Sequence, residues 1–364
     1  MGDKSGPLKR PRLPLNVKKI QTGPSLTGRM IGLIGLAVVC ALFFGFFALL
    51  RYGDNFLPPE NVSREIIVDI PPGATAAQVA EILHKAGVIR STDAFMKAIK
   101  IRGYIKKNTG LKAGEHVLNP SLSVWENLSL LVKGNFKVYN ITVPEGRSMR
   151  EIGKSLEDAG LANASEFLAL CRNHEFISSL GFHAESLEGF LFPETYAFTK
   201  NTQVKDIIKA MTNQFWKVWK KYDALAAKKG LSVNEVATLA SIVEKETASP
   251  KERPIIAQVF FNRLKRKMRL QTDPTVIYGI ENFDGNLTKA HLETHHPYNT
   301  YLIAGLPPGP IANPGEEAIK AVLNPSPGQY LYFVSKNDGT HHFSETLAEH
   351  NRMVNRYQKA QRGS

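Results

Sequence analysis

The distribution of apolar residues singles out one segment near the start of this 364-residue chain. Residues 30–50 read MIGLIGLAVVCALFFGFFALL, an unbroken run of 21 apolar or glycine residues between Arg29 and Arg51. A helix of this length measures about 32 Å, close to the thickness of the hydrocarbon core of a bilayer. The run is too long for the apolar part of a typical signal peptide, and no small-residue cleavage motif follows it. It therefore predicts a retained transmembrane helix.

After a predicted linker at residues 51–64, one pattern occurs twice. Residues 67–91 align with residues 140–164 at an offset of 73. Each copy has an apolar stretch, a Pro-x-Gly turn, a Thr or Ser at a helix N-cap position and apolar residues spaced i, i+4. An Ala-Gly pair closes each predicted helix. Both copies are expected to form a strand, a turn and an amphipathic helix, and the first opens a small α+β module at residues 65–134.

The second copy leads into a longer region, residues 135–360, where helical periodicity dominates. Its apolar spacing predicts helices near residues 165–173, 203–229, 232–247, 251–267 and 344–360, and YLYFVS at residues 330–335 is the clearest strand candidate. The predicted fold class is α+β. One N-terminal transmembrane helix precedes the small module, and a mixed, largely helical domain with short strands follows it.

Charge predicts how the chain is oriented in the membrane. The net charge is +13, of which the tail at residues 1–29 carries +6 and residues 52–364 carry another +6. The basic tail predicts a cytoplasmic N-terminus, with everything after Arg51 on the other side. The longer part is only mildly basic, so a nucleic-acid partner is poorly supported. Cys40 lies in the predicted membrane helix and Cys171 outside it, so the two cannot form a disulfide within one chain.

Two glutamates end a helix-like segment, LASIVEKET, at residues 239–247. Glu244 and Glu246 are two positions apart, so on a helix they point about 200° from each other and are no facing carboxylate pair. Glu244 follows small side chains, which would leave room for a ligand, whereas branched side chains lie beside Glu246. Periodicity alone leaves open whether either glutamate is catalytic or both are solvated at a helix end.

Three further segments are rich in turn formers and aromatic residues, a composition that indicates functional loops rather than disorder. They are LEGFLFPETYAFTK at residues 187–200, LQTDPTVIYG at residues 270–279 and PYNTYLIAGLPPGPIANPG at residues 297–315.

The order of these motifs resembles a known family. LASIVEKET, LQTDPTVIYG, YNTYLIAGLPPGPIANPG and YLYFV, after one membrane anchor, closely resemble the MltG (YceG-like) family of endolytic murein transglycosylases over roughly residues 65–350. The resemblance implies a LysM-like module at residues 65–134 and a catalytic domain at residues 135–360. It also implies that the glutamate after Ile-Val, here Glu244, is the catalytic acid/base, with Glu246 and Ser241 in supporting roles.

The resemblance further implies a carbon–oxygen lyase without a cofactor. Such an enzyme cleaves the β-1,4 bond between N-acetylmuramic acid and N-acetylglucosamine and leaves a 1,6-anhydro ring. One carboxylate suffices because the C6 hydroxyl of the substrate is the nucleophile, and an acid in this role is expected to have a raised pKa. The residues expected to bind the glycan are Gln271, Thr272, Asp273, Tyr298, Asn299, Tyr301, Glu188 and Glu194. For Asp273, Tyr298, Tyr301 and Glu194, structural roles in turns, core or surface remain open.

The implied location is the bacterial inner membrane, with a cytoplasmic N-terminus and an extracytoplasmic catalytic domain. The implied partners are peptidoglycan strands and peptidoglycan synthases, and the implied role is to terminate the elongation of nascent strands.

Two alternatives come from other classes of protein. Several histidines and a glutamate suggest a metallohydrolase by residue type alone. No His-Glu-x-x-His or comparable ligand spacing supports this alternative. The residues in question are His295, His296, His341, His342, Glu345 and His350. A non-catalytic, membrane-tethered protein that binds the cell wall is supported by the repeated small module.

Overall fold

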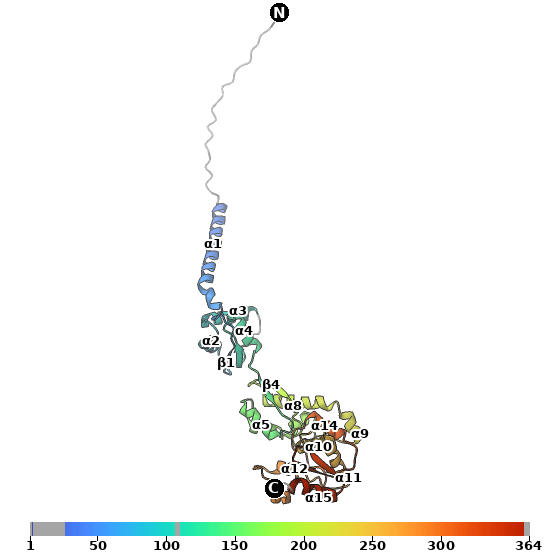
Figure 1. Ribbon diagram of the computed structural model, residues 1–364. Helices are drawn as coiled ribbons and strands as arrows, with labels where there is room; N and C mark the ends of the chain where they lie inside the picture. The colour runs from blue at the N-terminus through green and yellow to red at the C-terminus, as the bar shows by residue number, and fades with distance from the viewer. Residues whose placement is uncertain (1, 3–25, 106–109, 360–364) are drawn as a thin grey trace. The chain divides into compact units, whose positions relative to one another are not determined.

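The computed structural model describes Gly2, residues 26–105 and residues 110–359. Its contacts group the chain into two units (Figure 1). The first takes in residues up to 66, residues 74–112 and residues 118–133, and the second takes in residues 67–73, residues 113–117 and residues from 134 onwards.

The predicted N-terminal apolar helix is present as α1 (Leu26–Tyr52). Within it, Met30–Ala48 is long and apolar enough to cross a membrane, and none of this segment is buried against other parts of the chain. A short 3-10 helix, η1 (Gly53–Phe56), follows directly. Most of the basic tail at residues 1–29 lies outside the described residues.

The described residues of the small module form three helices and two strands in the order β1 (Ile66–Ile70), α2 (Ala76–Lys85), α3 (Thr92–Ile105), β2 (Gly114–Leu118) and α4 (Val124–Lys133). Strands β1 and β2 pair with each other, α2 packs on α3, and α3 packs on α4. Helix α2 begins where the sequence predicts, because the Thr75 hydroxyl accepts from the Gln78 backbone N–H and the Gln78 side chain accepts from the Thr75 N–H.

The second copy of the repeat has the same local structure. Strand β3 (Tyr139–Thr142) leads through a turn into α5 (Met149–Asp158), which Ser148 and Glu151 cap by the same reciprocal hydrogen bonds. Gly87 and Gly160, just past α2 and α5, both have a positive φ, as the predicted closing glycines require. The repeat is therefore confirmed at the level of elements. Strand β3 pairs antiparallel with β4 (Thr195–Phe198), with Tyr139 opposite Phe198 and Thr142 opposite Thr195.

The rest of the second unit is mainly helical. The prediction of one helix at residues 203–229 is wrong, because this segment forms two helices, α8 (Val204–Trp219) and α9 (Asp223–Lys229). Tyr222 between them packs against the core and donates its hydroxyl to Glu316 at 2.8 Å. The shorter elements before α8 are α6 (Ala164–Leu170) and α7 (His174–Ser179).

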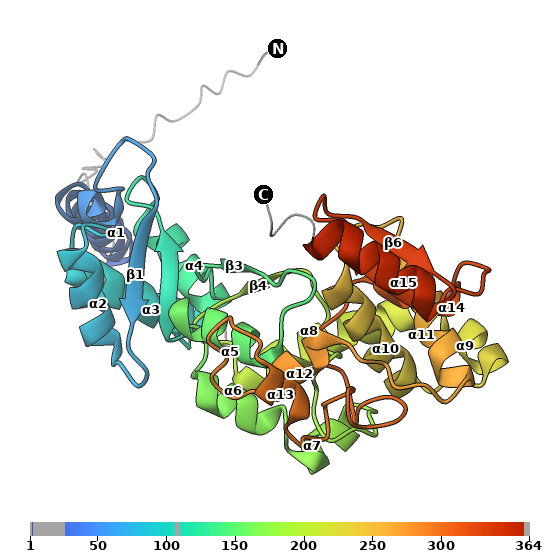
Figure 2. The ribbon, with the colours of Figure 1, turned by 60° about the horizontal axis from the view of Figure 1, so that its bottom comes forward.

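Helix α10 (Val233–Glu246) is the central element of the second unit, and α11 (Arg253–Lys265) and α14 (Glu316–Leu323) pack against it (Figure 2). All eight residues from Val236 to Val243 are buried. The small residues Ala237, Ala240 and Ser241, which precede Glu244, therefore lie in the core of the unit. The remaining elements are α12 (Asp273–Gly279), α13 (Lys289–Glu293), β5 (Tyr332–Ser335), β6 (His341–Ser344), α15 (Leu347–Val354) and a π-helical turn η2 (Asn355–Lys359). Strands β5 and β6 form an antiparallel hairpin.

Candidate active site

The last turn of α10 places its two glutamates in different surroundings. The helix ends at Glu246 because Thr247 is extended, with φ −146° and ψ 137°. The Glu244 side chain is 5% exposed and contacts Arg253, whereas Glu246 lines a cavity of about 460 Å³. The two carboxyl groups therefore have different neighbours.

Both carboxylate oxygens of Glu244 have a hydrogen-bond partner among the described residues. Its side chain is 5% exposed, its Oε1 accepts from Arg253 Nη2 at 2.6 Å and its Oε2 accepts from the Gly315 N–H at 3.1 Å. Burial raises the pKa of Glu244, against the opposing effects of Gly315 and Arg253. The Glu145 carboxylate also approaches Arg253, at 3.6 Å, and lies so close to Gly315 that a Cβ there would collide with it. Glu244 is thus the central acceptor of a packed polar cluster.

Glu246 borders the cavity and has one hydrogen-bond partner among the described side chains, the Thr272 hydroxyl, which donates to its Oε1. Burial raises the pKa of Glu246 to about 7, and the neighbouring Asp273 carboxylate adds to the rise. The Thr272 hydrogen bond and the positive charges of His341 and Arg263 oppose it. A carboxyl group with a pKa near 7 can both donate and accept a proton at neutral pH.

A tight loop before α12 delivers the polar groups on one side of Glu246. The Thr272 N–H donates to Thr300 Oγ1 at 3.0 Å, and the Gln271 N–H donates to the Thr300 carbonyl at 3.1 Å. Gln271 has a φ of 47°, in the left-handed region that a residue with a Cβ rarely adopts. Such strain is typical of positions whose geometry serves a site. The Tyr301 hydroxyl donates to Asp273 Oδ1 at 2.6 Å. Gln271, Thr272, Asp273 and Tyr301 therefore line the same cavity as Glu246.

Aromatic and basic side chains from the C-terminal elements form the other wall of this cavity, and most of them were not predicted as site residues. The Tyr332 ring stacks on His350 at 5.3 Å, and the Arg263 guanidinium lies 5.4 Å from the same ring. Arg263 also donates to the carbonyls of Leu331 and Leu270, so it ties β5 to the loop that carries Gln271. Tyr332 lies inside the YLYFVS motif, but nothing in the sequence pattern around Arg263 marks it as a site residue.

His341 is held by an acidic partner at the edge of the same cavity. Its Nδ1 lies 2.8 Å from Glu252 Oε2, and its backbone N–H donates to Glu252 Oε1 at 2.8 Å. Burial alone would raise the pKa of Glu252, but these hydrogen bonds outweigh it and the pKa is lowered. His342 pairs instead with Glu349, at 3.2 Å. Across the residues that the structure describes, no group of three or more His, Cys, Asp or Glu side chains is arranged to hold a metal ion.

Five of the sequence-predicted site residues lie away from Glu246. Glu188 is 1% exposed and accepts from the Met149 N–H, from Asn313 and from Tyr278, so it is part of the core beneath α5. Asn299 is also 1% exposed, and its side chain donates to the carbonyls of Leu292 and Thr294. Glu188 and Asn299 are thus both buried, and each has its polar atoms engaged in hydrogen bonds inside the fold.

The remaining three are Glu194, Tyr298 and Ser241. Glu194 is exposed beside β4 and does not line the cavity of Glu246. Tyr298 lines a different depression, of about 280 Å³, together with Tyr278 and Arg150. Ser241 is buried, and its hydroxyl accepts from the Ile311 N–H at 3.0 Å, so it supports the site only by fixing the 306–315 loop to α10.

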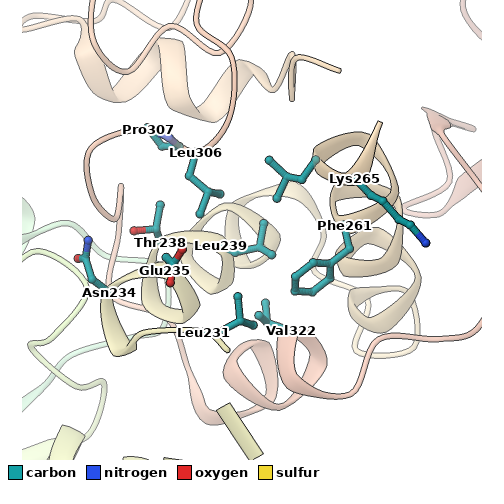
Figure 3. A pocket seen from close by; sticks show the side chains of 11 residues that line it. Leu231, Asn234, Glu235, Thr238, Leu239, Phe261, Lys265, Leu306, Pro307 and Val322 are labelled. Carbon is teal, nitrogen blue, oxygen red and sulfur yellow. The ribbon is translucent and has the colours of Figure 1, made fainter. Parts of the chain in front are cut away.

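A second cavity, of about 500 Å³, lies where α10, α11 and α14 meet the loop at Leu306 and Pro307. Figure 3 shows the side chains of Leu239, Leu306 and Phe261 turned towards one another in it. Its lining is mainly apolar, and its one carboxylate, Glu235, is engaged in the N-cap of α10. It therefore lacks the acid that glycan cleavage requires.

The polar cavity combines one carboxyl group of raised pKa with stacked aromatic rings and several hydrogen-bonding groups. This combination is typical of enzymes that cleave glycosidic bonds. Comparison with known proteins agrees with this class. The profile of the YceG-like family matches residues 68–356, and the chain belongs to that family.

Two relatives and one solved structure give the measure of the similarity. A protein of Bacillus subtilis named endolytic murein transglycosylase is 36% identical over 324 residues, which cover 84% of this chain and 89% of that protein. A protein of the same name from Streptococcus pneumoniae is 30% identical, and the match covers 85% of this chain but only 62% of that longer protein. The crystal structure of a YceG-like protein from Listeria monocytogenes matches with a TM-score of 0.56 and 32% identity, covering 80% of this chain and all of that one.

Proposed function

We propose that this protein is an endolytic lytic transglycosylase that cleaves the β-1,4 bond between N-acetylmuramic acid and N-acetylglucosamine within peptidoglycan strands. Membership of the YceG-like family and the names of the two relatives support the reaction class. The observation that carries the assignment to this site is the placement of Glu246. It is the glutamate of LASIVEKET that lines an open polar cavity and has a pKa raised to about 7.

We propose Glu246 for the role that the resemblance implies for Glu244, and Glu244 is the alternative acid for the same reaction. Both carboxyl groups have a raised pKa, so the pKa alone does not distinguish them. Their contacts differ, because Arg253 and the Gly315 N–H bind the two oxygens of Glu244, whereas Glu246 borders the cavity and binds Thr272. We assign Glu244 the task of holding α10, α11 and the loop at Gly315 together beneath the site.

The reaction proceeds by proton transfer to and from one carboxyl group. Protonated Glu246 donates its proton to the glycosidic oxygen as the bond from that oxygen to C1 of the muramic acid breaks. The C6 hydroxyl of the same sugar then attacks C1, and the Glu246 carboxylate accepts the hydroxyl proton. The 1,6-anhydro ring closes, the other strand leaves with a free C4 hydroxyl, and Glu246 returns to its acid form. No water is consumed, which is why one carboxylate suffices where a hydrolase uses two.

The groups around Glu246 fit this chemistry. The Thr272 hydroxyl fixes one oxygen of the carboxyl group and leaves the other for the substrate. Asp273, oriented by Tyr301, favours the neutral acid before bond cleavage through its negative charge. The Tyr332 ring and His350 supply flat faces on which sugar rings can pack.

The test is mass analysis of the products from purified peptidoglycan treated with the wild type, Glu246→Gln or Glu244→Gln. We expect anhydro-ended fragments from the wild type and none from Glu246→Gln, which keeps its fold. Glu244→Gln is expected to lose thermal stability and to cleave slowly while it remains folded. Full activity of a folded Glu246→Gln, together with inactivity of a folded Glu244→Gln, would return the acid role to Glu244. Products with water-added reducing ends would instead indicate a hydrolase.

A non-catalytic protein that binds the cell wall would release no fragments in any variant, so the same experiment tests that alternative. We further propose that α1 is a single-pass anchor in the inner membrane with a cytoplasmic N-terminus. In this proposal the module at residues 65–134 is LysM-like, and the anchored catalytic domain, residues 135–360, cooperates with peptidoglycan synthases to end nascent strands. The length and composition of Met30–Ala48 support the anchor.

A further inference from the structure

One apolar stripe of α3 continues past the region that packs against the rest of its unit. Ala94 and Ala98 are buried, at 2% and 0% exposure, and face the core of the small module. Ile101 and Ile105 continue the same stripe at the i+3 and i+4 spacing of a helix. They are 43% and 74% exposed, and the adjacent Tyr104 is 82% exposed. The last turns of α3 thus present large apolar side chains that the described residues of this unit leave exposed.

A second aromatic residue belongs to the same part of the unit. Arg102, in the last turns of α3, donates to Ser129 of α4 at 3.2 Å. Trp125 lies one turn before Ser129 on the same face of α4 and is 38% exposed. We call Ile101, Tyr104, Ile105 and Trp125 the exposed aromatic patch.

This patch lies close to where α1 ends. The Trp125 ring stacks on Phe56 at 6.1 Å and 11°, and Phe56 is the last residue of η1, which follows α1 without a gap. Helix α3 also packs against η1, and Figure 1 shows α3 at the end of the module that α1 joins. Eight residues, 49–56, lead from Ala48, where the segment that could span the membrane ends, to the end of η1 at Phe56. Four in an α-helix and four in a 3-10 helix span at most about 14 Å.

We propose that the exposed aromatic patch inserts into the headgroup layer of the membrane that α1 spans. Tyr and Trp side chains have an apolar ring and a polar tip, the combination that favours the interface between lipid and water. The two isoleucines add apolar surface, and transferring this surface from water to the acyl chains is favourable. The patch would hold the small module against the bilayer and so limit how far it can swing about η1. This inference rests on the proposed membrane anchor.

The test uses a tryptophan reporter in the full chain, reconstituted into phospholipid vesicles. Trp125→Phe removes the native tryptophan of the patch, whereas Trp216 and Trp219 of the second unit give the same background emission in every variant. Tyr104→Trp in this background places a new reporter in the patch. The matched control is Val138→Trp in the same background, at a residue that is 54% exposed and lies outside the module. Lipids with a nitroxide on the headgroup quench a tryptophan that lies in the headgroup layer.

We expect the headgroup nitroxide to quench most of the emission that Tyr104→Trp adds and to leave the emission of the Val138→Trp control unchanged. Iodide, which stays in the water, should quench the control and leave the emission of Tyr104→Trp unchanged. The proposal would be overturned if iodide quenched both reporters equally and nitroxide quenched neither. A protein partner would then be the occupant of the patch. The anchor is tested separately by co-flotation of the chain with the vesicles. A chain that does not float would refute both the anchor and this inference, whereas a floating chain with an unquenched reporter would refute the inference alone.

Discussion

At the scale of single residues, the central question is what separates two glutamates two positions apart. Glu244 lies beneath Arg253 and the Gly315 N–H, and Glu246 lies at the edge of a polar cavity. Their helical positions differ by about 200°, so neighbours from different elements surround each one. The sequence shows this angular difference but not which side opens to solvent, because the covering groups are far away in the chain.

The first prediction concerns the protonation of Glu246. Its pKa near 7 requires kcat/KM to decline as pH rises through 7, because the acid form that donates the proton is lost. Glu246→Gln should lower turnover by at least about 100-fold, the lower range for loss of a general acid. A pH profile measured on a soluble glycan substrate checks this. A profile that stays flat up to pH 9 would exclude Glu246 as the acid.

The second prediction concerns the hydroxyl that binds Glu246. Thr272→Val keeps the size of the side chain but removes the hydrogen bond to the carboxyl group, which lowers its pKa in the wild type. The alkaline decline of kcat/KM should therefore move to higher pH. Thr272→Ser keeps a hydroxyl and serves as the matched control, with a profile close to that of the wild type. An identical shift in both variants would show that packing, not the hydrogen bond, sets the pKa.

The third prediction concerns Glu188, a buried carboxyl group outside the cavity of Glu246. Burial raises the pKa of Glu188 to about 7 in the folded chain, whereas its ordinary value is 4.5. Folding therefore takes up a proton between these values, and the contribution to stability, full below pH 4.5, is lost as pH rises through 7. Glu188→Gln should remove this slope, worth at most about 3 kcal/mol, in the free energy of unfolding measured against pH. Turnover by the folded variant should stay close to that of the wild type, and a variant with normal stability but no turnover would place Glu188 in the active site.

At the scale of elements, the sequence predicts best where the signals are local. The paired strand, turn and helix units at β1–α2 and β3–α5 were predictable, because Thr75 and Ser148 cap their own helices within three residues. The loop of Gln271, Thr272 and Asp273 was predictable as part of the site from its motif. The opposite wall of the cavity was not predictable, because Arg263 of α11 and Tyr332 of β5 come into contact only in the folded chain.

The fourth prediction belongs to this scale. Asn299 ties the segment after α13 into a compact loop, because its amide donates to the carbonyls of Leu292 and Thr294 and its Oδ1 accepts from the Tyr301 N–H. Asn299→Ala leaves these buried groups unpaired and should cost roughly 1 to 3 kcal/mol in the free energy of unfolding for each group left without a partner. Since the same loop carries Thr300 and Tyr301, turnover should fall as well. Denaturant unfolding checks the first effect, and steady-state kinetics well below the melting temperature check the second.

Stability and KM together distinguish a structural role of Asn299 from direct substrate binding. If Asn299 bound substrate directly, Asn299→Ala would raise KM while leaving stability unchanged. Asn299→Asp, which keeps the acceptor for the Tyr301 N–H but loses the donor, should lie between the wild type and Asn299→Ala in stability.

At the scale of the whole molecule, the fifth prediction is that attachment to the membrane decides which strands are cut. The site around Glu246 lies entirely in the second unit, so residues 53–364 should cleave purified peptidoglycan as the full chain does. In a cell, the proposed anchor α1 would restrict the enzyme to the layer in which new strands are made. We therefore expect the full chain to shorten glycan strands and an exported form without α1 to shorten them much less at equal abundance. Chromatography of strand lengths measures this, and replacing residues 26–52 by an unrelated single-pass helix is the matched control. That replacement should restore the shortening if tethering alone matters. If it does not restore it although the protein is abundant and correctly inserted, α1 itself must contact a partner such as a peptidoglycan synthase within the bilayer.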